Sequence, residues 1–246
     1  MAHPTHPYIL KWSKLIAPNV RHLSFVREDN APLPFKAGQF ITLHIESPNK
    51  VVHRSYSIAN VPNQDNTIEL ACAYVEGGIA SGILFALNPG DAISASGPYG
   101  LFTLKEERPK RYILIATGTG ITPYRSMLQE IKTRIVNAHP ELQIALVFGI
   151  RNRSEVLFKD EFLAFQAKHS QFRFYACYSK ETPADLQPFE RLGHVQTTFP
   201  ELNLDPNQDI VYLCGNPNMI DDTFSLLTNN GFDKKNVRRE KYLFSK

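Results

Sequence analysis

The sequence predicts two domains of different fold class: a six-stranded antiparallel β-barrel, followed by an α/β domain with a doubly wound parallel sheet. The 246 residues are enough for two domains that each bury a core. Up to about residue 96, short alternating or β-branched runs are separated by turn residues. After residue 111, strand-like and helix-like runs alternate. The charged segment 105–110 lies between the two patterns, so we place the domains at residues 1–107 and 108–246.

The barrel is predicted from β-type runs that are separated by clusters of Pro, Gly, Asn and Asp. We expect its strands at residues 8–16, 20–26, 40–46, 55–59, 67–74 and 91–96. One helix, 79–87, is expected directly after the pair Gly77-Gly78. Six short strands at this spacing are typical of a small antiparallel barrel.

The second half of the chain has the rhythm of a parallel sheet with crossover helices. We expect strands at 112–116, 143–148, 172–178 and 210–213, and helices at 122–136, 159–168, 195–199 and 218–229. Doubly wound sheets bind ligands at the carboxyl ends of their strands. Thr119, Arg151 and Cys214 all fall at such ends.

The stretch around Gly118 and Gly120 combines a buried strand, a glycine turn and a helix start. Thr122 and Pro123 follow as an N-cap and a first helical residue. A helix N-terminus presents free N–H groups and a partial positive charge to a phosphate. The third glycine of the dinucleotide fingerprint is absent, so an unrelated glycine turn is an equally open interpretation.

Composition excludes several classes of protein. No run of 18 apolar residues is present, so we expect no membrane segment, and the N-terminus lacks the pattern of a secretory signal. Cys72, Cys177 and Cys214 are far apart, which predicts reduced thiols in a cytoplasmic protein and no iron–sulfur cluster. The histidines are scattered, so we expect no metal site. A net charge of +3 does not indicate nucleic-acid binding.

Basic residues gather near the C-terminus of the chain. They are Lys234, Lys235, Arg238, Arg239 and Lys241. Such a run is usually a solvated face, but it also suits an acidic protein partner.

A second informative stretch is 53–58, where Arg54, Tyr56 and two hydroxyl side chains share one predicted strand. The arginine fork suits a pyrophosphate, and the tyrosine ring offers a stacking face. The backbone N–H groups of Ile79 and Ala80 could bind the same pyrophosphate. Taken separately, Tyr56 could simply pack in the core and Arg54 could form an ordinary ion pair.

Five motifs in this order resemble those of the ferredoxin–NADP reductase family, of the bacterial type that also serves flavodoxin. They are Arg54-Ser55-Tyr56-Ser57, Gly78-Ile79-Ala80-Ser81, the segment 97–102, the segment 118–123 and the segment 214–219. The resemblance covers nearly the whole chain.

The resemblance implies that FAD binds the barrel. Arg54 would pair with the pyrophosphate, Tyr56 would stack on the flavin, and Ser57 would hydrogen-bond near flavin N5. The residues that it assigns to FAD are Arg54, Ser55, Tyr56, Ser57, Gly78, Ile79, Ala80, Ser81, Thr119 and Tyr242. It also assigns catalytic roles to Ser57, Cys214 and Glu240. A buried structural thiol is the alternative for Cys214.

The same resemblance implies an NADP site on the second domain. The residues assigned to it are Gly118, Thr119, Arg151, Ser179, Lys180, Asn216, Pro217 and Asp222. At two places where the family often has arginine, this chain has Lys180 and His194. Lysine offers charge without the planar fork, so the preference for NADP over NAD stays open. Arg153 is the next candidate for the coenzyme phosphate.

Near the C-terminus, Glu240-Lys241-Tyr242 is similar to the family's acidic residue followed by an aromatic residue that covers the flavin. Four residues follow, so Phe244 is the alternative cover, and the family places this tail against the flavin.

The resemblance therefore implies a ferredoxin/flavodoxin–NADP reductase. It would transfer hydride between NADPH and FAD and pass single electrons to ferredoxin or flavodoxin, as a cytoplasmic monomer. One alternative is an NAD(P)H-dependent reductase of free flavin, for which flavin is a substrate that leaves. Another is a non-catalytic nucleotide-binding docking subunit.

Overall fold

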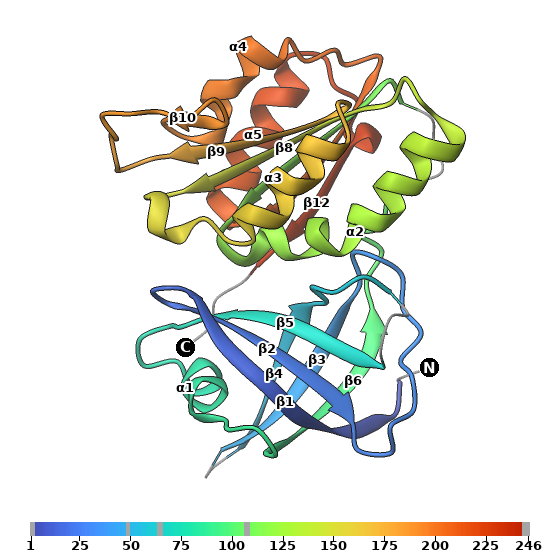
Figure 1. The fold of residues 1–246 in the computed structure, drawn as a ribbon, viewed down its shortest axis with the longest axis vertical. Coiled ribbons are helices and arrows are strands. Elements are labelled where there is room, and N and C mark those ends of the chain that lie inside the picture. Colours follow the sequence, from blue (N-terminus) through green and yellow to red (C-terminus); the bar gives the residue numbers. More distant parts are fainter. Residues whose placement is uncertain (1–2, 48–49, 63–65, 106–108, 243–246) are drawn as a thin grey trace. The chain divides into compact units, whose positions relative to one another are not determined.

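The computed structural model describes residues 3–47, 50–62, 66–105 and 109–242, apart from the side chain of Ala138. The chain divides into two compact units (Figure 1). The first contains the described residues up to Leu104 together with Thr122–Met127. The second contains Lys105–Ile121 and the described residues from Leu128 on. The predicted boundary between residues 107 and 108 lies outside the described residues and stays a prediction.

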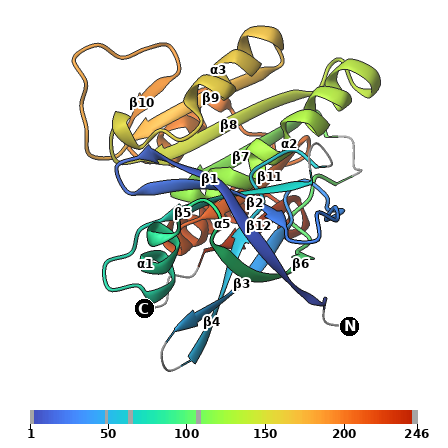
Figure 2. The same ribbon diagram turned by 60° about the horizontal axis from the view of Figure 1, so that its bottom comes forward.

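The first unit is a six-stranded antiparallel sheet, as predicted. Its strands are β1 (Thr5–Ala17), β2 (Val20–Arg27), β3 (Phe40–Ser47), β4 (Lys50–Ser57), β5 (Thr67–Ala73) and β6 (Ala92–Tyr99). They are hydrogen-bonded in the order β4-β3-β6-β1-β2-β5. The sheet curls into a barrel (Figure 2). Its edge strands β4 and β5 contact each other.

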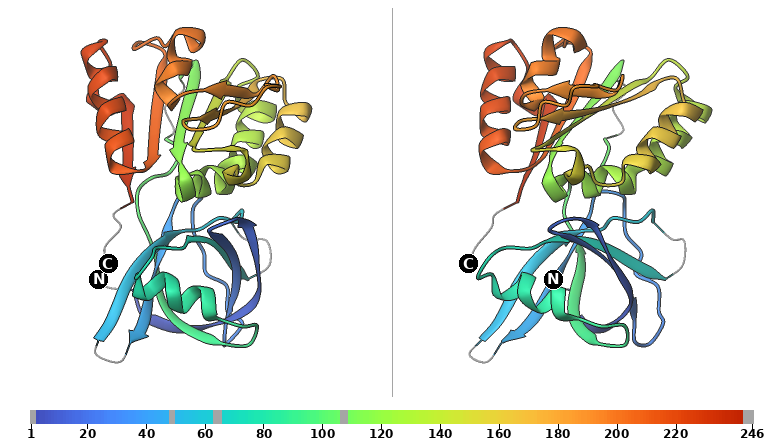
Figure 3. Two further views of the ribbon diagram at one scale, coloured as in Figure 1. Left: turned by 90° about the vertical axis from the view of Figure 1, so that its left-hand side faces the viewer. Right: turned by 60° about the vertical axis from the view of Figure 1, so that its left-hand side comes forward.

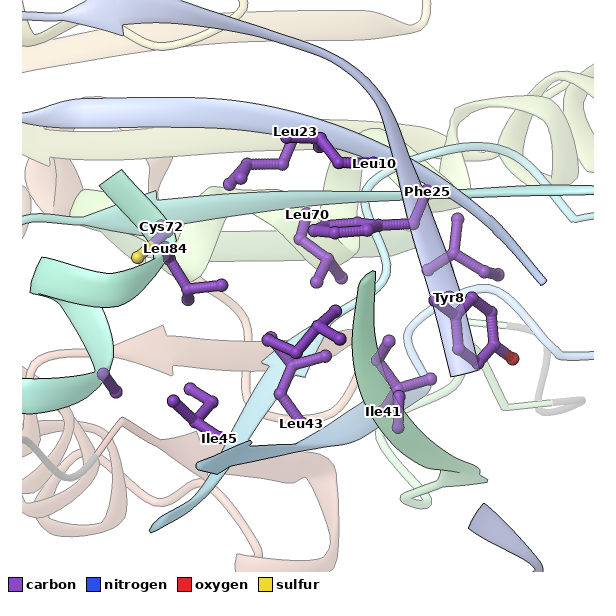
Figure 4. Close-up of a cluster of buried hydrophobic side chains, with 14 of the residues drawn as sticks. Tyr8, Leu10, Leu23, Phe25, Ile41, Leu43, Ile45, Leu70, Cys72 and Leu84 are labelled. Atoms are coloured by element: carbon purple, nitrogen blue, oxygen red, sulfur yellow. The ribbon is translucent and has the colours of Figure 1, made fainter. Parts of the chain in front are cut away.

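The barrel encloses a core of aliphatic and aromatic side chains (Figure 4). Leu10, Phe25 and Leu43 are each about 1 % exposed. Helix α1 (Ile79–Ala86) contributes Leu84, which lies close to Cys72 in this core. Burying each large apolar side chain stabilises the fold by about 1.5–3 kcal/mol. Helix α1 is thereby fixed to the barrel wall.

The second unit is a six-stranded parallel sheet flanked by helices. Its strands are β7 (Arg111–Thr117), β8 (Gln143–Ile150), β9 (Phe172–Tyr178), β10 (Glu190–Leu192), β11 (Asp209–Gly215) and β12 (Val237–Lys241), in the order β10-β9-β8-β7-β11-β12. The chain leaves β7 toward β8 on one side and later returns to β11 on the other side of β7. Such a reversal of strand order is the position at which doubly wound sheets bind ligands.

Helices cover both faces of this sheet (Figure 3). They are α2 (Thr122–Thr133), α3 (Lys159–Lys168), α4 (Phe199–Leu202) and α5 (Pro217–Asn229). One face packs Ile113 and Val211 with Ile220 of α5. On the other face, the Phe162 ring of α3 stacks on Phe174 of β9, with centroids 5.3 Å apart. In the described parts of the chain, no helix is long and apolar enough to cross a bilayer.

Some element boundaries differ from those predicted. Strand β4 begins at Lys50 rather than at residue 55, because its pairing with β3 extends as far as Ser47 and Lys50. The predicted helix 195–199 is a 3-10 turn, Val195–Thr198, followed by α4, whose first turn contains a proline. Strands β10 and β12 were not predicted. Both lie at sheet edges, where strands need no apolar run.

Candidate active site

Strand β4 presents Arg54 and Tyr56 on one face of the barrel sheet, since side chains alternate along a strand. The Tyr56 hydroxyl lies 3.7 Å from the Cys72 Sγ, and the ring packs against the barrel core. Burial raises the pKa of Tyr56 far above its usual value, so the phenol stays neutral. Ser57 is buried at the end of the strand. Ser55 points to the opposite face, where its hydroxyl is 3.2 Å from that of Thr42.

Helix α1 begins after a turn at Gly77 and Gly78, and Ser81 in the first turn of the helix stabilises this turn by hydrogen bonds. Ser81 Oγ accepts a hydrogen bond from the Val75 N–H at 3.1 Å and lies within 3.2 Å of the Gly78 carbonyl oxygen. A Cβ on Gly78 would come within 2.9 Å of that hydroxyl, so glycine is required. No side chain caps this fully described helix, and its first turn has no acidic residue. The N–H groups of Ile79 and Ala80 therefore suit an anion such as a pyrophosphate.

In the second unit, two loops meet at the strand-order reversal between β7 and β11. A Cβ on Gly120 would collide with the Cys214 carbonyl oxygen, and one on Gly215 would collide with that of Thr117. The Thr117 hydroxyl also accepts a hydrogen bond from the Asn216 N–H at 2.9 Å. The glycines thus permit backbone contact between the loops.

The turn after β7 has an exposed residue, Gly118, followed by a buried one, Thr119. Gly118 is exposed, and a Cβ there would meet nothing within 4 Å. Thr119 is buried in the 3-10 turn Gly118–Ile121 that leads into α2. Gly118 therefore leaves room for a ligand beside the helix start.

Cys214, Glu240 and Tyr242, predicted separately from the sequence, lie together in the second unit. Cys214 is fully buried and is paired in register with Glu240 on β12. The Tyr242 N–H donates to the Gly215 carbonyl oxygen at 2.8 Å, and its side chain hydrogen-bonds Cys214. Burial and the Glu240 charge raise the pKa of Cys214 well above its usual value, which outweighs the effect of Tyr242. The thiol is therefore neutral. Phe244 lies outside the described residues.

The two loops predicted to bind the coenzyme phosphate are joined to each other. The Lys180 and Glu181 N–H groups both donate to the Arg151 carbonyl oxygen at 3.0 Å. The Ser179 N–H donates to the Ile150 carbonyl oxygen at 2.9 Å. Arg151 and Lys180 are both exposed, so their charges face solvent at the carboxyl ends of neighbouring strands β8 and β9.

Arg153, the other candidate for the phosphate, is held in a different ion pair. Its Nε and Nη2 bind the two carboxylate oxygens of buried Glu190 at 2.9 and 2.5 Å, and its Nη1 binds Asp185 at 3.0 Å. Burial alone would raise the pKa of Glu190, but hydrogen bonds from Arg153, the Gln187 N–H and Tyr178 lower it to about 2. Arg153 therefore anchors the loop before β10.

Asn216, Pro217 and Asp222 lie on the loop after β11 and on α5. The Asn216 side chain is the N-cap of α5 and accepts from the Asn218 N–H at 2.8 Å. Pro217 occupies the first turn, where a missing N–H costs nothing. Asp222 is exposed on α5. The Asn216 side-chain oxygen Oδ1 is thus already engaged in capping.

Much of the basic C-terminal run interacts within the chain. The contacts are Lys235 with Asp233 at 3.2 Å, Lys241 with Asp221 at 2.7 Å, and Arg239 with the Phe224 ring at 3.7 Å from its centroid. This compensation reduces the charge that the run offers to an acidic partner. Among the described residues, no three His, Cys, Asp or Glu side chains form a cluster that could hold a metal ion.

Comparison with known proteins matches both halves of the chain. Residues 7–104 match the oxidoreductase FAD-binding domain, and residues 114–224 match the oxidoreductase NAD-binding domain. Over 235 residues the chain is 34 % identical to ferredoxin–NADP reductase B of Sorangium cellulosum, covering 92 % of this chain and 93 % of the relative. The chain belongs to the ferredoxin–NADP reductase family.

Reductase components of oxygenases also match. The reductase component of phenol 2-monooxygenase from Pseudomonas sp. strain CF600 is 29 % identical, over 98 % of this chain and 67 % of its own length. A ferredoxin–NADP reductase of Neisseria gonorrhoeae shares the fold, with a TM-score of 0.82, 23 % identity and coverage of 96 % and 98 % of the two chains. This ferredoxin–NADP reductase family member is therefore an oxidoreductase with one FAD-binding domain and one NAD-binding domain.

Two side chains around the proposed sites of this ferredoxin–NADP reductase family member were not predicted from the sequence. Arg21 binds the carbonyl groups that end α1, at 3.4 Å from the Leu84 oxygen and closer to that of Phe85. Glu155 holds Arg151, with 2.8 Å between Arg151 Nε and Glu155 Oε1. The spacing of four residues between Arg151 and Glu155 was a readable signal of an ion pair, whereas nothing local signalled Arg21.

Proposed function

We propose that this protein is a ferredoxin–NADP or flavodoxin–NADP reductase that acts as a cytoplasmic monomer. FAD, when bound, would supply the hydride-accepting and one-electron chemistry. The protein's part is to bind, orient and shield the reacting groups. The observation that supports this proposal most directly is the grouping of Cys214, Glu240 and Tyr242 at the strand-order reversal.

FAD is proposed to bind the first unit, taken as residues 1–107. Arg54 would pair with the pyrophosphate, opposite the uncapped start of α1 from Gly78 to Ser81. Tyr56 would stack on the flavin and Ser57 would hydrogen-bond it. Ser55 would contribute through its backbone, because its side chain turns to Thr42 on the other face of the strand.

NADP is proposed to bind the second unit, taken as residues 108–246. Gly118 and Thr119 would receive the nicotinamide end, and Arg151, Ser179 and Lys180 the 2′-phosphate. The mutual hydrogen bonds of the two phosphate loops support this assignment. Asn216 and Pro217 would fix the start of α5 beside the coenzyme. Asp222 would add an exposed polar side chain further along this helix.

Cys214 is proposed to lie against the nicotinamide during hydride transfer, with Glu240 as its polar partner in the second unit. In this structure the Tyr242 side chain is hydrogen-bonded to Cys214. We propose that Tyr242 moves away when nicotinamide binds. An intramolecular hydrogen bond contributes about 0.5–1.5 kcal/mol net, which coenzyme binding can offset.

The one-electron acceptor is proposed to be an acidic carrier such as ferredoxin or flavodoxin. The chain has three cysteines, fewer than the four that ligate an iron–sulfur cluster, so the acceptor lies outside these 246 residues. Coverage of 93 % of a ferredoxin–NADP reductase favours this carrier class. Similarity to an oxygenase reductase component makes an oxygenase partner the second candidate.

The test begins with the absorption spectrum of the purified protein. We expect FAD that stays bound through gel filtration and is bleached by NADPH under nitrogen, followed by reduction of added ferredoxin or flavodoxin. Arg54→Ala should weaken FAD binding about tenfold or more, since a charge-assisted bond contributes about 1.5–3 kcal/mol. Flavin that leaves the protein freely would support a free-flavin reductase instead. Bound FAD that NADPH does not bleach would support a docking subunit.

A further inference from the structure

Arg151 is held by a carboxylate of its own loop. Glu155 Oε1 lies 2.8 Å from Arg151 Nε and 2.6 Å from Nη2, and Glu155 Oε2 accepts from the Arg151 N–H at 3.2 Å. The Glu155 side chain is 16 % exposed and that of Arg151 is 55 % exposed. Glu155 is therefore fixed beneath a guanidinium that still reaches solvent. Among the described residues, Arg151 Nη1 has no hydrogen-bond partner.

The surrounding loops carry carboxylates close to their basic side chains. Glu181 accepts a hydrogen bond from the Arg153 N–H at 2.6 Å, and the Arg153 side chain is bound by Asp185 and Glu190. Lys180 forms no ion pair within the described part of the chain and is exposed. A dianionic phosphate at Arg151 and Lys180 would thus meet two cations but also a fixed carboxylate.

We propose that Glu155 is a specificity-determining residue that limits the preference of this enzyme for NADP over NAD, by competing with the 2′-phosphate for Arg151. This inference rests on the proposed function, which binds the 2′-phosphate at Arg151. Glu155 occupies the Nε edge of the guanidinium, so the phosphate binds through the Nη1 side. NAD has no phosphate at this position, and its binding is indifferent to the Glu155 charge.

The size of the effect follows from the geometry of a shared guanidinium. A carboxylate and a phosphate on opposite edges of one guanidinium lie about 6 Å apart. At this distance, in a solvent-exposed loop, their repulsion weakens binding by about three- to tenfold. Removing the Glu155 charge while keeping an acceptor oxygen should therefore raise the affinity about three- to tenfold, and only for ligands that carry the 2′-phosphate.

The experiment measures two dissociation constants by calorimetry on the FAD-loaded protein. The probes are adenosine 2′,5′-bisphosphate, which carries the 2′-phosphate, and 5′-AMP, which lacks it. We expect Glu155→Gln to raise the preference for the bisphosphate about three- to tenfold and to leave 5′-AMP binding unchanged. The gain should shrink as salt rises from about 0.05 M to about 0.5 M, because exposed charges are screened.

Three further variants make the result specific. Glu201→Gln is the matched control, because Glu201 binds Arg191 at 2.7 and 2.6 Å in an equivalent ion pair on the same unit. Glu155→Asp keeps the charge. Both should match the wild-type preference within about twofold, since neither removes a charge beside Arg151. Arg151→Ala should abolish most of the preference.

The outcomes separate the inference from the function on which it rests. If Arg151→Ala lowers the preference but Glu155→Gln does not raise it, Glu155 merely positions Arg151 and the inference is overturned. An equal gain in Glu201→Gln would also overturn it, because the effect would then be one of net charge. If Arg151→Ala leaves the preference unchanged, the 2′-phosphate binds elsewhere, and the proposed coenzyme site fails together with the inference.

Discussion

Cys214 and Cys177 are both fully buried thiols of the parallel sheet, yet only Cys214 lies against a tyrosine and opposite a glutamate. Burial raises the pKa of Cys177 to about 12 and that of Cys214 well above its usual value. Neither thiol is ionised at neutral pH, so any difference between them comes from position rather than from charge. The pair therefore offers a controlled test of the proposed hydride-transfer site.

Cys214→Ala should keep FAD bound and slow its reduction by NADPH about tenfold or more, a change of about 1.4 kcal/mol in the barrier. The physical reason is that Cys214 would shape the surface against which nicotinamide is held. Stopped-flow absorbance under nitrogen gives the rate. Cys177→Ala is the control and should reduce at the wild-type rate. Equal rates in the wild type and both variants would show that Cys214 only packs in the sheet and has no part in hydride transfer.

At the residue scale, the sequence predicted the orientation of a side chain where that orientation depends on residues close in the chain. Strand alternation put Arg54 and Tyr56 on one face, and the same rule could have shown that Ser55 faces the other way. The role of Arg153 depended on Glu190, which is 37 residues away and joins it only after the sheet forms. Long-range carboxylates of this kind leave no local pattern.

Helix α1 shows how one short element is held at both ends. It has only eight residues, and isolated helices of this length are not stable in water. Ser81 holds the turn at its start, and Arg21 of β2 donates to the carbonyl groups at its end. A positive charge at a helix C-terminus also complements the helix dipole. The position of the proposed pyrophosphate site thus depends on Arg21, a residue remote in sequence.

Arg21→Gln should weaken FAD binding about three- to tenfold, because loss of a charged cap costs about 0.3–1 kcal/mol directly and loosens the helix start further. The dissociation constant is measured by flavin fluorescence on reconstitution of the apoprotein. Arg27→Gln is the control, since Arg27 is on the same strand and binds exposed Asp29 at 2.5 Å. Wild-type affinity in Arg21→Gln would show that α1 keeps its position without this cap.

Elements with a clear apolar rhythm were predicted within a few residues, and those without one were missed. Helix α1 was expected at 79–87 and spans Ile79–Ala86. Strand β12 reads Val237-Arg-Arg-Glu-Lys241, a charged run that becomes a strand only because β11 provides a partner. Its placement brings Glu240 to Cys214. That part of the candidate site therefore came from the family resemblance rather than from periodicity.

For the whole molecule, the change from short strands to alternating strands and helices was enough to predict two fold classes in one chain. The strand order was not predictable, because it is set by crossovers that carry no local signal. Each unit has its own core and its own ion pair with a largely buried carboxylate, Glu69 in the first unit and Glu190 in the second. Their stabilities can therefore be probed separately.

The loss of stability at low pH offers such a probe for the first unit. Glu69 accepts hydrogen bonds from His22 at 3.0 Å and from Arg125 at 2.7 Å. Burial alone would raise its pKa, but these partners lower it from 4.5 to about 2. Since the folded pKa is below the unfolded one, the stabilisation is complete above about pH 4.5 and is lost as the pH falls toward 2. After allowance for solvent screening, it amounts to about 2 kcal/mol.

Glu69→Gln should therefore destabilise the first unit at pH 7 and flatten the decline of its stability below pH 4.5. Trp12, the single tryptophan, packs edge-on against His22 at 5.0 Å, so its fluorescence reports this network directly. Urea unfolding followed by Trp12 fluorescence at pH 7, 5, 4 and 3 gives the profile. Glu46→Gln removes an exposed carboxylate of the same unit and should follow the wild type. If Glu69→Gln declined as steeply as the wild type between pH 4.5 and 3, other carboxylates would control the loss of stability at low pH.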